Sequence, residues 1–343
     1  MITFRSITPA LAGFALLAQV AATPALAGPK IEQWTAPNGA HVLYVESHAL
    51  PLVDIQVDFS AGSAYEPADK AGLAGLTRSL LEAGASELDE QQIADRIADI
   101  GAQVGGSTDN DRSGLSIRSL SSPAERDAAV ELAASLLAQP SFPADILERE
   151  RTRAIAGLRE ALTKPATLAA RRFNEALYPG HPYGTSVTPE SLEAITRDDL
   201  IDFHRQHFGP QRASLAIVGD VDRATAEQIA TRLTERLPPV KPAPPLPTPA
   251  PTQPTTVHIT NPSAQAHILI GQPGMAREDA DYFPLLVGNY VLGGGGFVSR
   301  LTKEVREKRG FAYSVYSYFA PQQVAGPFQI GLQTRGSQTE EAL

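Results

Sequence analysis

The stretch LPLVDIQVDFSAGS, residues 50–63, alternates apolar and polar side chains with a period of two. Side chains of a β-strand point alternately to opposite faces, so this pattern predicts a strand with one face on a core and the other toward water. Strands of this kind are typical of antiparallel sheets. Residues 41–46 predict a partner strand, and Asn38–Gly39 supplies the turn before it. The apolar face would consist of Val53, Ile55, Val57 and Phe59.

The segments that follow carry the spacing and the end signals of helices. Gly101 predicts the end of one helix, and Pro123 and Pro140 predict the beginning and the end of the next. Because strands and helices come in separate runs, we predict an α+β fold in which helices pack on an antiparallel sheet. The predicted helices cover residues 88–100, 123–139, 142–161 and 167–177, and further strands cover residues 102–109, 112–120 and 213–218.

A proline-rich stretch, LPPVKPAPPLPTPAPTQP over residues 237–254, divides the chain. Proline on this scale prevents a helix or a central strand and favours an extended linker, although a proline-rich ligand for another domain is the alternative. We therefore predict a first unit over residues 28–236, a linker over residues 237–256 and a similar second unit over residues 257–343.

The second unit repeats the first in kind, with strands, then helices, then strands. It is much shorter, and its last residues, GSQTEEAL, resemble the beginning of a helix, so we expect a truncated second domain. Its predicted strands cover residues 255–260, 265–274, 311–319 and 326–334, and its predicted helices cover residues 279–292 and 299–308.

Composition and the N-terminus limit the class of protein. A net charge of -9 with no long basic run makes nucleic acid an unsuitable partner, and the absence of cysteine excludes disulfides and thiolate metal sites. Arg5, the apolar residues 10–22 and the small residues Ala25 and Ala27 predict a secretory signal peptide over residues 1–27, against the alternative of a buried N-terminal helix. We expect an exported, periplasmic protein with no membrane-spanning segment.

Several segments together resemble one known family. They are GSAYEPADKAGLAGLTRSLLEAGA, LERERTRAIAGLREAL, YPGHPYGTSVTPESLEAIT, DLIDFHRQHFGPQRASLAIVGDVD and VLGGGGFVSRLTKEVREKRGFAYSVYS. In this order they are similar to the inverted zinc metallopeptidases, the family of pitrilysin, insulinase and mitochondrial processing peptidase. The resemblance implies two similar α+β domains closed around a peptide.

The resemblance also locates a zinc site that this chain lacks. Family members carry H-x-x-E-H on a helix, with two histidines as zinc ligands and the glutamate as base on the zinc-bound water. The matching positions here are Gly75, Arg78 and Ser79, and arginine is a permanent cation that cannot act as a base. The third ligand, a glutamate in a later helix, would fall near Gly157, which is not acidic although Glu150 and Glu160 flank it. The chain itself is therefore expected to bind no metal and no other cofactor.

The second half of the family fold supplies an arginine and a tyrosine that hold the substrate carbonyl beside the zinc. Arg306 and Tyr313 in REKRGFAY have that spacing. A guanidinium and a phenol hydroxyl can both donate hydrogen bonds to the oxyanion that forms when water attacks a peptide bond. The alternative is that Arg306 is one of several last-turn cations favoured by the helix dipole and that Tyr313 is a half-buried strand residue.

Other candidate groups have structural interpretations. His204 and His207 are three residues apart, a spacing that zinc ligands can have, but they are also placed at a helix end before Gly209–Pro210. The four glycines at residues 293–296 lack the lysine and hydroxyl of a phosphate loop, so they predict a hinge or a close backbone approach.

Three functional hypotheses follow from the resemblance. The first is a non-metal subunit of a heteromeric zinc metallopeptidase, in which a homologous partner holds zinc and this chain supplies Arg306 and Tyr313 to peptide substrates. The second is a catalytically inactive homologue that binds peptides or serves as a scaffold. The third, a peptidase that acts alone, conflicts with the lost ligands.

Overall fold

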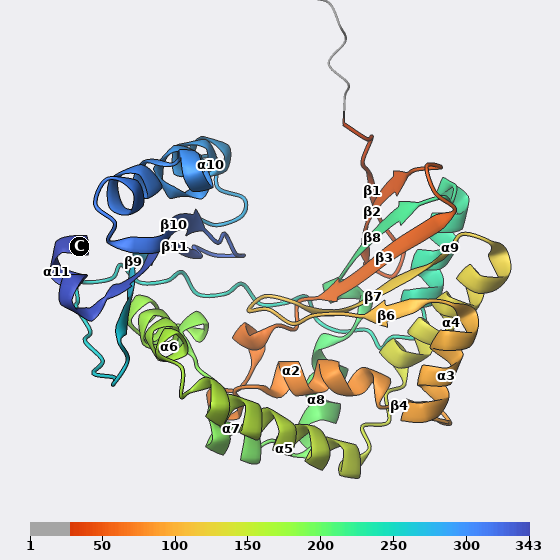
Figure 1. Ribbon diagram of the computed structural model, residues 1–343. Helices are drawn as coiled ribbons and strands as arrows, with labels where there is room; N and C mark the ends of the chain where they lie inside the picture. Colours follow the sequence, from red (N-terminus) through yellow and green to blue (C-terminus); the bar gives the residue numbers. More distant parts are fainter. Residues whose placement is uncertain (1–27) are drawn as a thin grey trace, which may run out of the picture.

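The computed structural model describes residues 28–343, so the predicted signal peptide lies outside the described residues. The first unit is built on a six-stranded sheet (Figure 1). Neighbouring strands are antiparallel except for β2 and β8, which run parallel. In spatial order the strands are β1 (Glu32–Thr35), β2 (His41–Glu46), β8 (Ala213–Gly219), β3 (Leu52–Phe59), β7 (Ser113–Leu120) and β6 (Gln103–Gly105).

Strand β3 is the alternating stretch of the sequence, and every second side chain along it is buried. The predicted pairing of β3 with residues 41–46 is wrong, because β8 lies between β2 and β3. The turn at Asn38–Gly39 instead joins β2 to β1, and Gly39 adopts a φ of +98° there. The physical reason is that β8, a distant and largely apolar strand, fills the centre of the sheet.

Four of the eight α-helices described for the first unit were predicted, and each forms within two residues of its predicted bounds. Helices of this unit cover the apolar face of the sheet. Helices α2 and α4 pack on β7, and α9 packs on β2. The opposite face is polar, with a surface ion pair between Arg118 and Asp54. The helices are α2 (Leu73–Ser79), α3 (Glu90–Ile100), α4 (Pro123–Ala138), α5 (Ala144–Ala161), α6 (Pro165–Leu177), α7 (Pro189–Glu193), α8 (Arg197–His207) and α9 (Arg223–Thr234). A two-stranded ribbon, β4 (Gly84–Ala85) and β5 (Leu88–Asp89), precedes α3.

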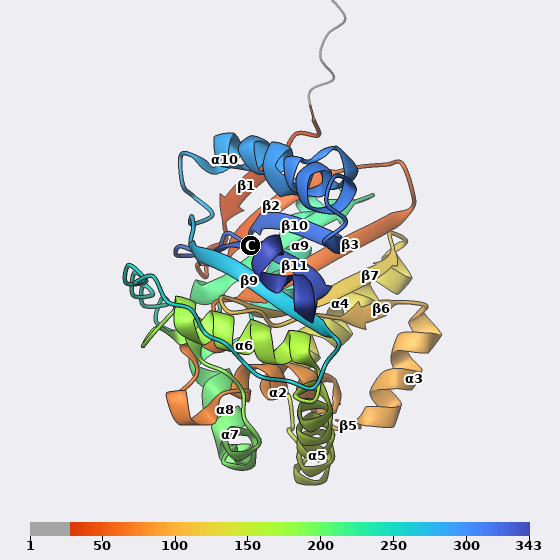
Figure 2. The same cartoon turned by 60° about the vertical axis from the view of Figure 1, so that its left-hand side comes forward.

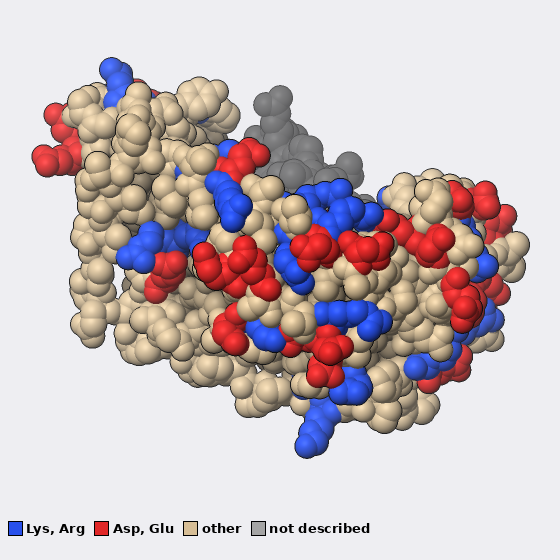
Figure 3. Space-filling model, turned by 90° about the horizontal axis from the view of Figure 1, so that it is seen from below, with Lys and Arg blue, Asp and Glu red and all other residues tan. Residues whose placement is uncertain are grey.

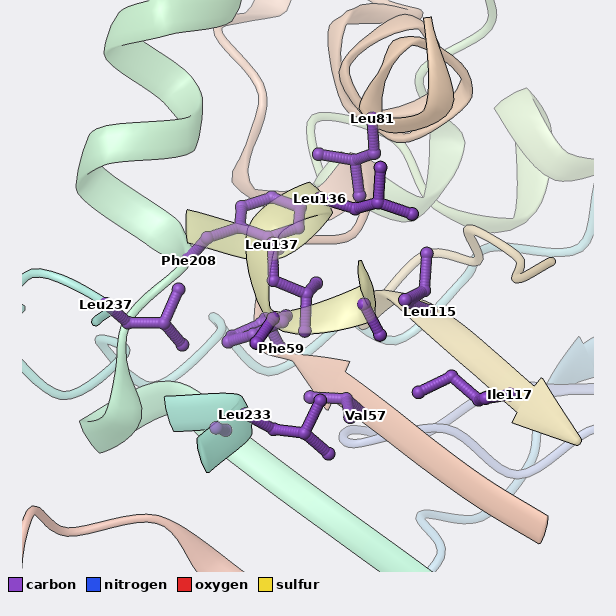
Figure 4. Close-up of a cluster of buried hydrophobic side chains, with 14 of the residues drawn as sticks. Val57, Phe59, Leu81, Leu115, Ile117, Leu136, Leu137, Phe208, Leu233 and Leu237 are labelled. Carbon is purple, nitrogen blue, oxygen red and sulfur yellow. The ribbon is translucent and has the colours of Figure 1, made fainter. Parts of the chain in front are cut away.

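The main core lies between the sheet and these helices (Figure 4). Phe59 of β3 lies beside Leu137 of α4, Val57 of β3 lies beside Leu233 of α9, and all four side chains are buried. Each apolar side chain of this size contributes about 2 kcal/mol when it is removed from water. The core thus fixes the sheet against α4 and, through Leu233, against α9.

The second unit contains a three-stranded antiparallel sheet with a helical layer on each side (Figure 2). Helix α10 (Tyr282–Asn289), continued by a π-helical turn at Tyr290–Gly294, covers one side, and α6 of the first unit packs against β9 on the other. A π-helical segment, Thr302–Glu307, lies in the second predicted helix. The strands lie in the order β10 (Ala312–Phe319), β11 (Pro327–Arg335) and β9 (Gln265–Pro273), and a short helix α11 (Thr339–Ala342) ends the chain as given.

The predicted strand over residues 255–260 is wrong. These residues are exposed, and none of them pairs with a strand within the described part of the chain. The proline-rich residues 237–256 form neither helix nor strand. They are held on the first unit, where Val240 donates to the Gln211 side chain over 2.8 Å and the His181 ring bonds the Pro247 carbonyl over 2.9 Å.

A loop between β10 and β11, residues 320–326, joins the two units through polar contacts. Asp111 of the first unit accepts the Gln323 backbone N–H over 2.8 Å and also accepts the hydroxyl of Tyr183. The Tyr65 hydroxyl donates to the Gln323 side chain over 3.0 Å. Asp111 thus binds residues of both units. We call Asp111, Tyr183, Tyr65 and Gln323 together the Asp111 contact.

The outer face of α10 is apolar and exposed. Phe283, Leu286, Val287, Tyr290 and Val291 recur at helical spacing, and each is between 46% and 72% exposed. Within residues 28–343 nothing covers this face, which leaves it free to contact another segment or another chain.

Figure 3 views the molecule from the side on which α5 and α7 lie, and shows basic and acidic side chains interspersed on that face. The ion pairs of α5, such as Arg151 with Glu148 and Arg153 with Glu150, account for part of this pattern. Within residues 28–343, no helix combines the length and the apolar character that a bilayer crossing requires.

Candidate functional site

Helix α2, the helix that the family resemblance assigns to zinc, is firmly anchored at its N-terminus. The Glu66 carboxylate accepts the backbone N–H groups of Gly72 and Ala74 over 3.0 and 2.6 Å, so it satisfies donors that a helix start otherwise leaves unpaired. Burial nevertheless raises the pKa of Glu66. Gly72 has a φ of +105°, and a Cβ there would lie 2.7 Å from Leu192, so only glycine fits this turn.

Two of the three zinc-helix positions, Gly75 and Ser79, lie on the exposed side of α2. Gly75 and Ser79 lie one turn apart and are exposed, whereas Leu76 and Thr77 face the core. A Cβ at Gly75 would meet no atom within 4 Å. The Ser79 hydroxyl is already engaged with the Leu76 carbonyl over 3.0 Å.

Arg78 has a structural role at the position where the family has its base. Its guanidinium donates to Glu82 over 2.9 Å, one turn along the chain, and to the Gly114 carbonyl of β7 over 3.3 Å. Gly106 gives it room, since a Cβ there would lie 2.8 Å from two guanidinium nitrogens. Arg78 therefore connects α2 to the sheet.

The fourth position, Gly157, lies exposed on α5, the helix that packs against α2. Glycine, arginine and an engaged serine offer no imidazole or carboxylate, so the donor set at these four positions does not fit zinc. Within residues 28–343, no group of three or more His, Cys, Asp or Glu side chains is arranged to hold a metal ion.

His204 and His207 are embedded in the first unit. His204 is 7% exposed, bonds the Leu137 carbonyl over 2.8 Å and stacks on Phe208. Burial lowers its pKa to about 4. His207 meets the Arg212 guanidinium over 2.6 Å, and burial together with that cation lowers its pKa to about 4. Both contacts agree with the structural interpretation of this pair.

The structure brings Arg306 and Tyr313 together. The guanidinium carbon of Arg306 lies 4.9 Å from the ring centroid of Tyr313, whose side chain is 84% exposed. It lies at the same distance, 4.9 Å, from the ring centroid of Phe297. We call these three residues the Arg306 cluster. Phe297 was missed by the sequence reasoning, although its place directly after four glycines was a signal.

Arg306 differs from the neighbouring cations in its ion pairing. Lys308 and Arg309 both bind Glu304, over 2.6 and 3.2 Å. Among residues 28–343, Arg306 has neither an ion-pair partner nor a side-chain hydrogen bond, and the Tyr313 hydroxyl has no hydrogen bond either. These donors are therefore available to an oxygen atom of a bound molecule.

The glycines before Phe297 allow the backbone there to lie close to Ser317 of β10. A Cβ at Gly293 would lie 2.4 Å from the Ser317 hydroxyl and 2.5 Å from its backbone nitrogen. Gly296 has a φ of +58°, which favours glycine and turns the chain back toward the helix of Arg306.

The two candidate half-sites lie in different units. Gly75, Arg78 and Ser79 belong to α2 of the first unit, and Tyr313 belongs to β10 of the second (Figure 1). Among the described residues, no hydrogen bond, ion pair or ring contact joins the Arg306 cluster to α2 or to Gly157.

A cavity of about 620 Å³ lies between α6 and the three-stranded sheet. Ala166, Ala169 and Ala170 line it on the helix side, and Tyr316 and Tyr318 line it on the sheet side. Its lining contains no carboxylate, lysine or arginine, and His267 is its histidine.

Comparison with known proteins matches both halves of the chain. A family model described as insulinase (peptidase family M16) matches residues 41–190, and one described as the peptidase M16 inactive domain matches residues 194–343. The boundary between the models falls inside the first unit, because β8 and α9 complete its sheet and core.

Solved structures and curated proteins also match most of the chain. A peptidase M16 inactive domain from Pseudomonas fluorescens is 37% identical, with a TM-score of 0.89 over 91% of this chain and 76% of that one. A protease from Helicobacter pylori has the same fold at 22% identity, with a TM-score of 0.81 over 92% of this chain and 78% of that one.

An uncharacterized zinc protease of Mycobacterium leprae is 30% identical over 82% of this chain. The chain spans 64% of the length of that protein, somewhat less than two thirds. With the two family models and the Pseudomonas structure, these matches show that the chain belongs to peptidase family M16, the insulinase family, and that it is a member without the H-x-x-E-H motif.

Proposed function

We propose that this chain is the non-metal subunit of a heteromeric zinc metallopeptidase that cleaves peptides. In this proposal a homologous partner carries H-x-x-E-H and holds the zinc, and Arg306 and Tyr313 bind the substrate carbonyl and stabilise the oxyanion. The observation that carries the proposal is the Arg306 cluster, in which a guanidinium without a carboxylate partner among residues 28–343 lies beside an exposed tyrosine. The names of the relatives, an M16 inactive domain and a zinc protease, fit such a division of labour.

The chemistry of the cluster supports this role. The attack of water on a peptide bond places a negative charge on the carbonyl oxygen, and a fixed guanidinium and a phenol can each donate to that oxygen. Neither group has to break an existing hydrogen bond within residues 28–343 in order to do so. By contrast, Arg78 cannot serve as a base, because it is permanently charged and is engaged with Glu82 and Gly114.

The test is reconstitution with a homologue from the same organism that carries H-x-x-E-H. The full chain, the homologue and their mixture are assayed for cleavage of a fluorogenic peptide library, and each is analysed for zinc. We expect no stoichiometric zinc in this chain, zinc in the homologue, and peptidase activity that rises on mixing. About one tightly held zinc per copy of this chain, or a mixture with no complex and no gain in activity, would contradict the proposal.

The second candidate is a catalytically inactive homologue that binds peptides or serves as a scaffold. The match to a family model described as an inactive domain favours it, and the apolar face of α10 suits a lasting protein contact. The same mixing experiment separates the two candidates. A stable complex whose activity is unaffected by Arg306→Ala would support the scaffold.

We also propose that the protein is exported to the periplasm. The support is the predicted signal peptide, with its small residues at Ala25 and Ala27. The mature chain would begin at Gly28. Mass spectrometry of the protein from the native cell envelope tests this, and a chain that retains Met1 in the cytoplasm would contradict it.

A further inference from the structure

Phe297 is a large apolar side chain that the fold does not use. It is 72% exposed, and its neighbour Val298 is 76% exposed. Neither belongs to the hydrophobic clusters of the described residues. An exposed phenylalanine contributes little to stability, so its contact with Arg306 is the feature that distinguishes it from an ordinary surface residue.

The backbone that carries Phe297 is fixed. A short 3-10 turn, Gly296–Val298, presents the ring. Ser299 is fully buried, and its hydroxyl donates to the Gly296 carbonyl over 2.7 Å and accepts the Thr302 backbone N–H over 3.3 Å. Because Thr302 begins the helical segment that contains Arg306, the turn and the arginine are held in one framework.

We propose that Phe297 is a positioning residue, which together with Tyr313 orients the Arg306 guanidinium for the substrate carbonyl. The inference rests on the proposed function of Arg306 and adds a residue to it. The guanidinium carbon lies 4.9 Å from both ring centroids, a distance at which an aromatic ring attracts a cation.

The geometry suits an oxyanion donor. An aromatic ring binds a cation over its face, and the N–H groups of a guanidinium point outward in its own plane. Rings can therefore restrict the rotamers of Arg306 without occupying its donors. A long arginine side chain otherwise loses much rotamer freedom when it binds substrate, so a pre-positioned one binds a transition state better.

Spectroscopy of the full chain tests the contact without any partner. The side-chain resonances of Arg306 are assigned with the help of Arg306→Lys and then compared between Phe297→Leu, Phe297→Tyr and Val298→Ala. Phe297→Leu keeps an apolar side chain but removes the ring, so we expect the Arg306 signals to lose a ring-current shift. Phe297→Tyr should restore that shift. Val298→Ala, at an equally exposed position of the same turn, should leave it unchanged.

Kinetics of the reconstituted complex tests the role. Phe297→Leu should lower kcat about two- to fivefold, the factor expected for one exposed cation–π contact, with a smaller effect on KM. Phe297→Tyr should restore kcat. Because Phe297 acts through Arg306, Phe297→Leu should have no further effect in an Arg306→Ala background.

The outcomes separate this inference from the proposed function. Arg306 signals that do not respond to Phe297→Leu overturn the inference, whether or not the complex is active. An additional loss of kcat in the Arg306→Ala background also overturns it, since Phe297 would then act independently. If the signals respond and the mixture has no activity, it is the proposed function of Arg306 that fails, and a positioning role in catalysis fails with it.

Discussion

His204 should make the stability of the first unit depend on pH. Its imidazole is 7% exposed, bonds the Leu137 carbonyl over 2.8 Å and stacks on Phe208, and burial lowers its pKa from 6.5 to about 4. The folded state therefore keeps His204 neutral at pH values where the unfolded chain binds a proton. Because the unfolded state binds more protons between these two pKa values, stability is present above pH 6.5 and is lost as the pH falls toward 4.

The magnitude follows from the difference between the two pKa values. A lowering from 6.5 to about 4 corresponds to about 3 kcal/mol when the loss is complete, and about 2 kcal/mol of this is lost by pH 5. Most carboxylates are still ionised at pH 5, so the interval between pH 7 and pH 5 reports mainly on histidines.

The assay is urea unfolding of the mature chain at pH 7 and pH 5, for the wild type and for His204→Gln. Glutamine can donate to the Leu137 carbonyl but does not titrate, so the variant should lose about 2 kcal/mol less than the wild type over this interval. His207 and His48 remain in both proteins and cancel in the comparison. His41→Gln, at an exposed position of β2, is the matched control and should behave like the wild type. An equal loss in the wild type and in His204→Gln would refute the reasoning.

Four further predictions concern the site and its framework. In the reconstituted complex, Arg306→Ala and Tyr313→Phe should each lower kcat by a factor of ~10²–10³. Arg309→Ala is the control and should have little effect, because Arg309 binds Glu304. Equal losses for Arg306→Ala and Arg309→Ala would contradict the assignment. Thr77→Val should stabilise the chain against urea by about 1 kcal/mol, because the buried Thr77 hydroxyl has no partner among the described residues. Gly293→Ala should destabilise it by about 1–3 kcal/mol, because the new methyl would overlap Ser317. Asp111→Ala removes an acceptor shared by both units, so it should speed limited proteolysis within residues 320–326, and an unchanged cleavage rate would show that the Asp111 contact is dispensable.

The sequence predicted most elements because their signals are local. The alternation in residues 52–59 and the proline at the start of α4 depend only on neighbouring residues, and both elements form where they were expected. The order of the strands is not local. Nothing near residues 41–46 indicates that β8, from the far end of the unit, will separate them from β3.

For residues 255–260, the local pattern predicted a strand that does not form. Their composition favours a strand, but a strand forms only where a neighbouring strand can bind its backbone, and no strand of the described residues pairs with them. Local pattern therefore overestimates strands at the margin of a sheet.

In the candidate site, too, the local features were predictable from the sequence and the non-local ones were not. The proximity of Arg306 and Tyr313 was predictable from their spacing, because both residues lie on one short segment that turns at Gly310. Phe297 could not be identified in this way. Its contact depends on a turn at Gly296 with a positive φ and on the buried hydroxyl of Ser299, which are properties of the folded chain.

Arg78 occupies the position of the family's base and has a structural role of its own. A simple loss of ligands would leave the position of the base free, but here the guanidinium connects α2 to β7 and is only 14% exposed. Arg78→Glu would break that connection and place a second carboxylate one turn from Glu82, where like charges repel. Histidines at Gly75 and Ser79 alone would therefore not recover a base. The helix that corresponds to the family's zinc helix thus stabilises the sheet, whereas Arg306 and Tyr313 have no side-chain hydrogen bond among residues 28–343.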